Sequence, residues 1–179
     1  MSGPAATVRL AGVERLEELR PLWLALHDHH TRIPERMAPL RERTRSGSWR
    51  RRRAVYERYL GQGGSFCLLA ERERRAVGYA MVWIGCGLTV GAGAGTLAYL
   101  TSLSVLPEHR EQGVGGALLA EVRDRALRET EARQVLVGVQ TWNERALRFY
   151  ARHGFRTTAP GMLVAPCAPQ PERCLNQRA

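Results

Sequence analysis

The sequence contains no lysine: all 27 of its basic residues are arginines, set against 17 acidic residues, and the formal net charge is +10. The missing lysine excludes a P-loop, because the G-x-x-x-x-G-K-[ST] pattern places a lysine on the phosphates of a nucleotide. The charge itself allows three interpretations: a nucleic-acid surface, attraction of a polyphosphate molecule, or arginine replacing lysine through genome composition. We give the last the greatest weight, although it does not explain the excess of positive charge.

Long apolar runs and paired cysteines are missing as well. No stretch of about 18 apolar residues is present, which argues against a membrane-spanning helix. Residues 1–10 lack the basic-then-apolar layout of a signal peptide. The four cysteines form no C-x-x-C pair, and we interpret them as reduced thiols, with a Cys167–Cys174 disulfide as a minor alternative. We therefore predict a cytoplasmic protein.

The most informative stretch runs from Leu97 to Leu119, where a strand-like segment is followed by a glycine-rich turn and the start of a helix. The first turn of a helix has backbone N–H groups without intrahelical partners and about +0.5 of partial charge. Glycines let a phosphate approach those N–H groups closely. A dinucleotide-binding G-x-G-x-x-G/A pattern fails, because the sixth position counted from Gly113 is Leu118.

The turn does satisfy the pattern [QR]-x-x-G-x-[GA], with Arg110, Gly113 and Gly115 at its defined positions. In this pattern, and in the surrounding string VLPEHREQGVGGALL, the chain resembles the pyrophosphate loop of the GNAT acetyltransferase superfamily. A second string, N-x-x-A-x-x-F-Y-x-x-x-G-F, runs from Asn143 to Phe155 and resembles the last helix of that family. The resemblance covers residues 76–164 well, whereas residues 1–75 match only in the order of their elements.

The residue patterns and the resemblance predict one domain over residues 1–166 and a polar, proline-rich tail over 167–179. We expect an α/β fold of the α+β type, GNAT-like, with a mostly antiparallel sheet of six to seven strands, one parallel βαβ crossover and about four helices. Residues 31–47 and 85–95 are predicted to be connectors, the former a loop or short helix. The strands are expected at 7–11, 66–71, 76–85, 97–105, 134–140, 155–158 and 161–165. The helices are expected at 13–30 (divided at Pro21), 49–60 (capped by Ser48), 112–130 and 143–153.

The resemblance implies acetyl-CoA as the co-substrate. The H-x-H-H run from His27 to His30 could bind a metal, but no other ligands cluster with it in the sequence, so we expect no metal. The pyrophosphate of acetyl-CoA would lie on backbone N–H groups at residues 112–117, assisted by Arg110. Its pantetheine arm would lie along the strand edge at 103–105, where two parallel strands splay, with Asn143 on the other side. The predicted binding residues are Leu103, Ser104, Val105, Arg110, Glu111, Gln112, Gly113, Val114, Gly115, Gly116, Ala117, Asn143, Ala146 and Tyr150.

The resemblance also implies direct attack of a primary amine on the thioester in a ternary complex, with a backbone N–H near Leu103 stabilising the oxyanion. Tyr150 is the candidate general acid for the departing thiolate. A tyrosine with a pKa of about 10 is protonated at pH 7, but full proton transfer to a thiolate with a pKa of about 8.5 is uphill. We therefore expect Tyr150 to act partly as a hydrogen-bond donor.

The general base is the gap in this prediction. A lysine-type amine is neutral in about 1 part in 2,500 at pH 7, so its proton must be removed. No Asp or Glu lies between Glu73 and Glu108, although many relatives carry a carboxylate in the central strand. We expect either a water relay through Thr101 or Ser102 or a group from the first helix. The candidates there are His27, Asp28, His29 and His30, of which His27 and His30 are predicted to bind substrate; the alternative is imidazolium favoured by a helix C-terminus.

Two other functions stay open from the sequence. One is a regulatory module that binds acyl-CoA with little or no turnover; the other is a nucleic-acid-binding protein, which the scattered arginines disfavour outside residues 50–53. The leading prediction is an N-acetyltransferase acting on a small-molecule or peptide amine, with no membrane partner and with a homodimer left open. Because the protein is strongly basic, we expect that the acceptor is not a polycation.

Overall fold

The computed structural model describes residues 5–31, 45–86, 96–159 and 161–166. The predicted tail, most of the connectors at 31–47 and 85–95, and three of the four cysteine side chains lie outside this part. The strands are β1 (Thr7–Ala11), β2 (Phe66–Arg72), β3 (Arg75–Cys86), β4 (Thr96–Val105), β5 (Gln134–Gly138), β6 (Arg156–Ala159) and β7 (Met162–Pro166). The helices are α1 (Leu19–Thr31), α2 (Arg45–Leu60), α3 (Val114–Glu129) and α4 (Glu144–Arg152), with short 3-10 turns η1 (Val13–Glu18) and η3 (Pro107–His109).

The described strands form one sheet in the order β1-β2-β3-β4-β5-β7-β6. Neighbouring strands are antiparallel except β4 and β5, which pair in parallel and are connected through α3. The predicted mixed sheet with a single parallel crossover is therefore confirmed. The crossover places the start of α3 and the loop before it at the end of β4, in the middle of the sheet.

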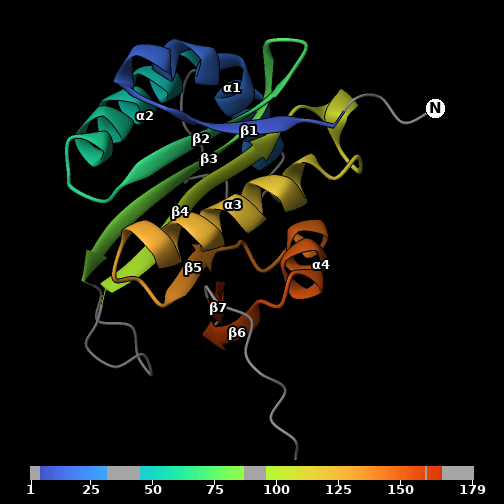
Figure 1. Cartoon of the computed structure of the whole chain (residues 1–179). Helices are drawn as coiled ribbons and strands as arrows, with labels where there is room; N and C mark the ends of the chain where they lie inside the picture. The colour runs from blue at the N-terminus through green and yellow to red at the C-terminus, as the bar shows by residue number, and fades with distance from the viewer. Residues whose placement is uncertain (1–4, 32–44, 87–95, 160, 167–179) are drawn as a thin grey trace, which may run out of the picture.

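The helices cover both faces of the sheet (Figure 1). On one face η1, α1 and α2 bury Leu16, Leu22 and Tyr56 against residues of β2 and β3. On the other face α3 buries Leu118 and Val122 against residues of β2, β3, β4, β5 and β7, and residues of α4 complete this cluster. Pro21 lies in the first turn of α1, where a missing N–H is tolerated, so the predicted division of the first helix is confirmed.

The predicted cap of the second helix is wrong. α2 begins at Arg45, three residues before Ser48, and Ser48 is buried in the helix interior. Its hydroxyl oxygen accepts a hydrogen bond from the indole Nε1 of Trp23 at 3.1 Å. Ser48 therefore satisfies the buried indole N–H of Trp23. Without this acceptor, the unsatisfied N–H in the core would lower the stability of the fold.

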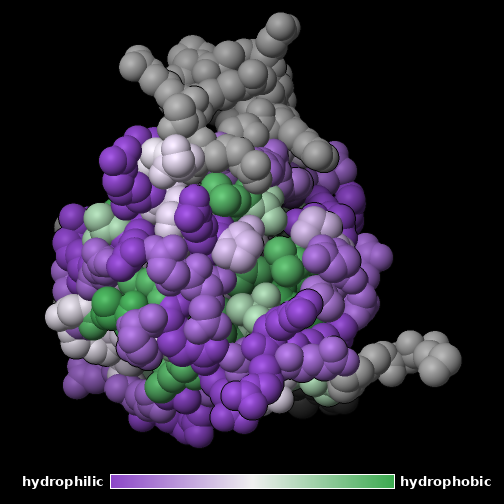
Figure 2. Space-filling model, turned by 90° about the horizontal axis from the view of Figure 1, so that it is seen from above, coloured by the Kyte–Doolittle hydropathy of each residue, from purple (hydrophilic) through white to green (hydrophobic). Residues whose placement is uncertain are grey.

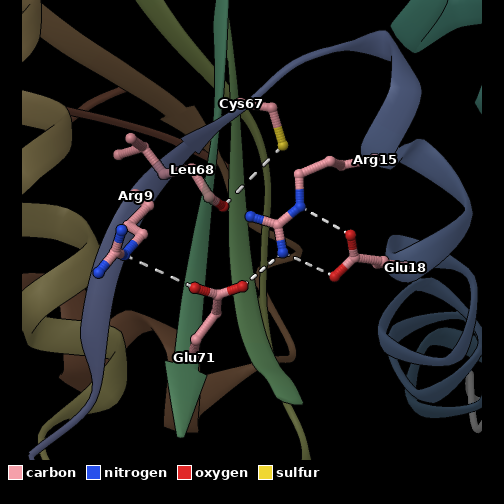
Figure 3. A network of polar contacts seen from close by, with 6 residues as sticks. All are labelled: Arg9, Arg15, Glu18, Cys67, Leu68 and Glu71. Carbon is pink, nitrogen blue, oxygen red and sulfur yellow. Dashed lines mark hydrogen bonds and ion pairs between the residues drawn. The ribbon is translucent and has the colours of Figure 1, made fainter. Parts of the chain in front are cut away.

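An ionic cluster holds the N-terminal elements together (Figure 3). Arg15 in η1 donates to both oxygens of Glu18, at 2.7 and 2.8 Å, and also binds the carboxylate of Glu71 in β2. Arg9 in β1 lies 3.8 Å from the second oxygen of Glu71. These hydrogen bonds lower the pKa of Glu18 and raise that of Arg15. The cluster fixes η1, and with it the entry into α1, against the sheet.

Candidate active site

The two parallel strands of the crossover separate beyond their midpoint. β4 and β5 pair only at Ala98–Leu100 against Val135–Val137. After Gly138 the chain follows β7 instead, since the N–H of Val139 donates to the carbonyl of Gly161 at 2.7 Å. Within the described structure, the β5-facing edge of residues 101–105 therefore has no strand partner. This edge carries backbone groups able to bind an extended ligand, and the predicted splay is present.

A β-bulge lies where this free edge begins. Met81 of β3 pairs with Ser102 and Val82 pairs with Leu100, so Thr101 is an extra residue in β4. The Thr101 hydroxyl donates to the carbonyl of Met81 at 3.0 Å. Bulges bend a strand and redirect its backbone groups. The bend therefore coincides with the point at which β4 leaves β5.

A chain of buried hydroxyls holds the bulge from the α2 side. The Tyr56 hydroxyl donates to Ser102 Oγ at 2.6 Å, and Ser102 Oγ donates to the carbonyl of Thr101 at 2.8 Å. Tyr79 lies 3.0 Å from the Tyr56 oxygen and must be the donor there, because Tyr56 has only one hydroxyl proton. Burial raises the pKa of Tyr56 to about 12 and that of Tyr79 well above its ordinary value. Both predicted relay residues, Thr101 and Ser102, thus already commit their protons to backbone carbonyls.

The glycine-rich turn forms the cradle expected at the start of α3. Gly113 is the N-cap residue, with a φ of 80°, and Glu111 also has a positive φ, 63°. The helical hydrogen bonds begin with the Ala117 N–H, which donates to Gly113 at 2.9 Å. The N–H groups of residues 114–116 are therefore those that a helix start leaves for an external acceptor. Because a Cβ on Gly113 would meet nothing within 4 Å, the approach to these groups is open.

Arginines surround this cradle. The Nε of Arg110 donates to the carbonyl of Val105 at 3.0 Å and so joins the turn to the end of β4. Arg72, the last residue of β2, binds the side-chain oxygen of Gln112. Arg145 of α4 forms an ion pair with Glu111 at 3.0 Å. Positive side chains around a helix N-terminus favour an anion there.

The structure brings the two sequence motifs into direct contact. A Cβ added to Gly115 would lie 3.3 Å from the ring of Phe149 and 3.8 Å from Val105. A Cβ added to Gly116 would lie 3.0 Å from the Nε2 of His153. Both glycines therefore allow α4 to pack closely on the first turn of α3. The cradle, the end of β4 and α4 meet at one place, as the predicted site requires.

Asn143 and Tyr150 lie at the two ends of α4. Asn143 is its N-cap, and its side-chain oxygen accepts the Ala146 N–H at 3.1 Å. Tyr150 is buried between Phe149 and Phe155, with ring centroids 5.2 Å from each. Burial raises the pKa of Tyr150 well above its ordinary value. At neutral pH the phenol is therefore protonated and able to donate a hydrogen bond.

The histidines at the end of α1 have different surroundings. His27 is buried, and its Nδ1 lies 3.6 Å from the carboxylate of Asp28. The Nε2 of His29 lies 3.4 Å from the side-chain nitrogen of Asn143. The side chain of His30 lies outside the described structure. No three His, Cys, Asp or Glu side chains among the described residues gather as a metal site would require.

A family model described as the acetyltransferase (GNAT) family matches residues 23–155. The chain belongs to the GNAT acetyltransferase family. The predicted family is thus confirmed.

GNAT relatives agree with this assignment. The chain is 34% identical over 103 residues to an uncharacterized N-acetyltransferase of Mycobacterium tuberculosis, and the match covers 58% of this chain and 60% of that protein. The PaiA N-acetyltransferase of Thermoplasma acidophilum, solved with coenzyme A, has a TM-score of 0.66 at 16% identity, covering 90% and 97% of the two chains. An aminoglycoside N-acetyltransferase, AAC(6')-Iy, solved with a bisubstrate analogue, has a TM-score of 0.66 at 20% identity, covering 87% and 94%. At such identities the structural likeness shows the GNAT fold.

Several residues of this GNAT site escaped the sequence patterns. Tyr56 and Tyr79 join the bulge only through contacts between residues 23 and 46 positions apart. Nothing in their local sequence distinguishes them from other buried tyrosines. Arg145 on α4 and His153, which directly follows α4, could have been found, because both lie within one turn of motif residues and carry groups suited to polar contacts.

Proposed function

We propose that the protein transfers the acetyl group of acetyl-CoA to a primary amine in a ternary complex. The observation that carries this proposal is the junction of three elements: the N–H groups at the start of α3, the unpaired edge of β4 and the N-cap of α4. The cradle is open at Gly113, where an added Cβ would meet nothing within 4 Å. A cradle of this form suits a pyrophosphate, and an unpaired strand edge suits the amide groups of pantetheine.

The residue roles follow from these contacts. Backbone N–H groups at 112–117 would bind the pyrophosphate, with Arg110 beside them. The free backbone edge at 103–105 would hold the pantetheine arm. The Asn143 amide would contact the arm from the other side, because its oxygen caps α4 and its nitrogen is a hydrogen-bond donor. A backbone N–H near Leu103 would stabilise the charge that develops on the carbonyl oxygen.

The transfer has a simple balance of bonds and protons. One nitrogen–carbon bond forms and one carbon–sulfur bond breaks, so the amine loses a proton and the thiolate gains one. Tyr150 would donate a hydrogen bond to the departing sulfur. Since burial raises its pKa, complete proton transfer is less favourable than for an exposed tyrosine, and the phenol would act mainly by stabilising negative charge.

The test is a screen of amines with acetyl-CoA, read by the free thiol that is released. A suitable panel contains phenethylamine, tyramine, amino-acid methyl esters, a short peptide with a free N-terminus, spermine and the aminoglycoside neamine. We expect acetylation of at least one amine, confirmed by a mass increase of one acetyl group. Thiol release that is independent of every amine, or tight CoA binding without turnover, would contradict the proposal.

The acceptor is expected to carry little positive charge beyond its reacting amine. The face of the molecule seen in Figure 2 is mostly hydrophilic, and the net charge of +10 would repel a polycation. The aminoglycoside acetyltransferase of the same fold therefore does not predict this acceptor. Efficient acetylation of spermine or neamine in the screen would refute this expectation while leaving the acetyl transfer itself intact.

A further inference from the structure

The contact between α1 and α4 bears on which side chain accepts the proton of the acceptor amine. Asn143 Nδ2 lies 3.4 Å from His29 Nε2, although the two residues are 114 positions apart. The α1 helix therefore brings an imidazole to the same amide that the proposed function places against the pantetheine arm. The side chain of His29 is half-buried at this position.

The orientation of the amide decides the state of the imidazole. Asn143 Oδ1 accepts the Ala146 N–H at 3.1 Å, so the atom facing His29 is the nitrogen. An amide nitrogen only donates hydrogen bonds. The Nε2 of His29 must therefore be the acceptor, which places the proton of the neutral ring on Nδ1. An imidazolium would set two donors against each other at this contact.

The other candidates for the base are less suitable. The hydroxyl protons of Thr101 and Ser102 are committed to the carbonyls of Met81 and Thr101, and β3 and β4 contain no carboxylate, because no Asp or Glu lies between Glu73 and Glu108. His27 is buried, with only 7% of its surface exposed. His29 alone among these groups combines a basic lone pair with a contact to Asn143.

We propose that His29 is the general base, taking the proton from the acceptor amine through Nε2. This inference rests on the proposed function and names a residue for one of its steps. A contact of 3.4 Å is long for a hydrogen bond, so Nε2 exchanges the amide for an ammonium N–H or a bridging water at small cost. The amine proton passes to Nε2, the nitrogen lone pair then bonds to the acetyl carbon, and the imidazolium releases the proton to solvent.

Charged groups near the contact between His29 and Asn143 influence how the activity depends on pH. On α1, Asp28 precedes His29 and lies 3.6 Å from His27. On α4, Glu144 is in the first turn and pairs with Arg148 at 2.9 Å. Beyond it, Arg145 pairs with Glu111. A base must be neutral to act, so activity is expected to rise with pH as the imidazole loses its proton.

Two variants separate proton transfer from simple positioning. His29→Gln keeps an oxygen that can accept the Asn143 amide but has no basic nitrogen; His29→Ala removes both. The control is Arg20→Gln, an exposed position of the same helix. Each is assayed with acetyl-CoA and the amine that the wild-type protein acetylates fastest in the screen above.

We expect kcat to fall by about 100-fold or more in both His29 variants, since general-base catalysis contributes about 10²–10⁴-fold. KM for acetyl-CoA should stay within about twofold of wild type, and the rise of activity with pH should vanish. Added imidazole should restore part of kcat in His29→Ala. If His29→Gln keeps the wild-type kcat and pH profile, the inference is wrong and the acetyl transfer stands. If the wild-type protein acetylates no amine, both the inference about His29 and the proposed acetyl transfer are wrong.

A second measurement needs no acceptor amine and no catalytic turnover. Nitrogen-15 NMR of the histidine rings reports which nitrogen carries the proton, and the His29 signals are assigned by their loss in His29→Gln. We expect an unprotonated Nε2 and a protonated Nδ1 in the protein at pH 7.5, with both shifts changing when CoA is added. A protonated Nε2 would overturn the inference.

Discussion

At Tyr150, burial determines which proton chemistry the side chain can perform. The ring is packed between two phenylalanines, and desolvation of the phenolate raises its pKa well above the ordinary value. The phenol is thus a weaker acid than free tyrosine. It can still stabilise a developing thiolate by hydrogen bonding, because that requires no complete transfer of the proton.

Removing this hydroxyl should therefore affect catalysis more than stability. We expect Tyr150→Phe to lower kcat by about 100-fold, with KM for acetyl-CoA nearly unchanged. The hydroxyl makes no hydrogen bond to a described residue, so its loss leaves no partner unsatisfied, and the urea unfolding midpoint should stay close to wild type. Steady-state kinetics and urea denaturation measure the two effects.

Tyr59→Phe is the matched control, because it removes the same group from α2, where Tyr59 packs 6.4 Å from the ring of Trp83. Its kcat should equal that of wild type. A Tyr150→Phe protein with full kcat would show that the sulfur departs without help from this phenol.

At the scale of elements, the start of α3 combines an open cradle with a left-handed backbone conformation that glycine adopts readily. Gly113 has a φ of 80°, and Gly154, which follows α4, has a φ of 79°. A Cβ at either position would meet nothing within 4 Å. Alanine is disfavoured in this conformation by about 1 kcal/mol, so the two substitutions should destabilise the protein equally.

Only the substitution in the cradle should weaken cofactor binding. Gly113→Ala places a methyl group beside the N–H groups that would bind the pyrophosphate, and we expect KM for acetyl-CoA to rise about tenfold, or ~1.4 kcal/mol. Gly154→Ala should leave KM unchanged despite the same loss in thermal stability. Equal KM values for the two variants would show that the cradle does not take part in binding acetyl-CoA.

The elements also show which parts of the site could be predicted from the sequence. The cradle and α4 were predictable because each is formed by one continuous segment of the sequence, with glycines and an N-cap residue at fixed spacings. The cap at Ser48 was mispredicted because the hydroxyl binds Trp23, 25 residues away. The hydroxyl chain at Thr101 and the contact of His29 with Asn143 depend on tertiary packing, which no local spacing records. His29 is one of the four candidates for the general base predicted from the first helix, but only the structure distinguishes it from His27.

At the scale of the whole molecule, the absence of lysine simplifies behaviour in alkali. Arginine stays charged above pH 12, so tyrosines and cysteines dominate the proton release of the chain between pH 9 and 12. Among the described residues, Tyr56, Tyr79, Tyr150 and Cys67 are buried. Burial raises the pKa of Tyr56 and of Cys67 to about 12, from 10.0 and 9.0, and raises those of the other two tyrosines as well.

The free energy of unfolding should therefore fall steeply above pH 9 to 10. In this range the unfolded chain has lost protons that the folded chain keeps, so each group lowers stability by about 1.4 kcal/mol per pH unit until its folded pKa is reached. The negative charges that form on tyrosines and cysteines lower the net positive charge and so reduce self-repulsion, which acts in the opposite direction. Salt screens charges on the surface, however. At moderate salt, the buried groups should dominate.

Urea denaturation at a series of pH values tests this directly, with tyrosinate absorbance at 295 nm followed in parallel. Ionisation of the buried tyrosines should coincide with loss of helical circular dichroism. Tyr56→Phe should give a shallower slope, by about 1.4 kcal/mol per pH unit between pH 10 and 12, because one group no longer releases its proton on unfolding. A variant with the wild-type slope would mean that the Tyr56 hydroxyl reaches solvent, and that the chain holding the bulge of β4 is not closed to water.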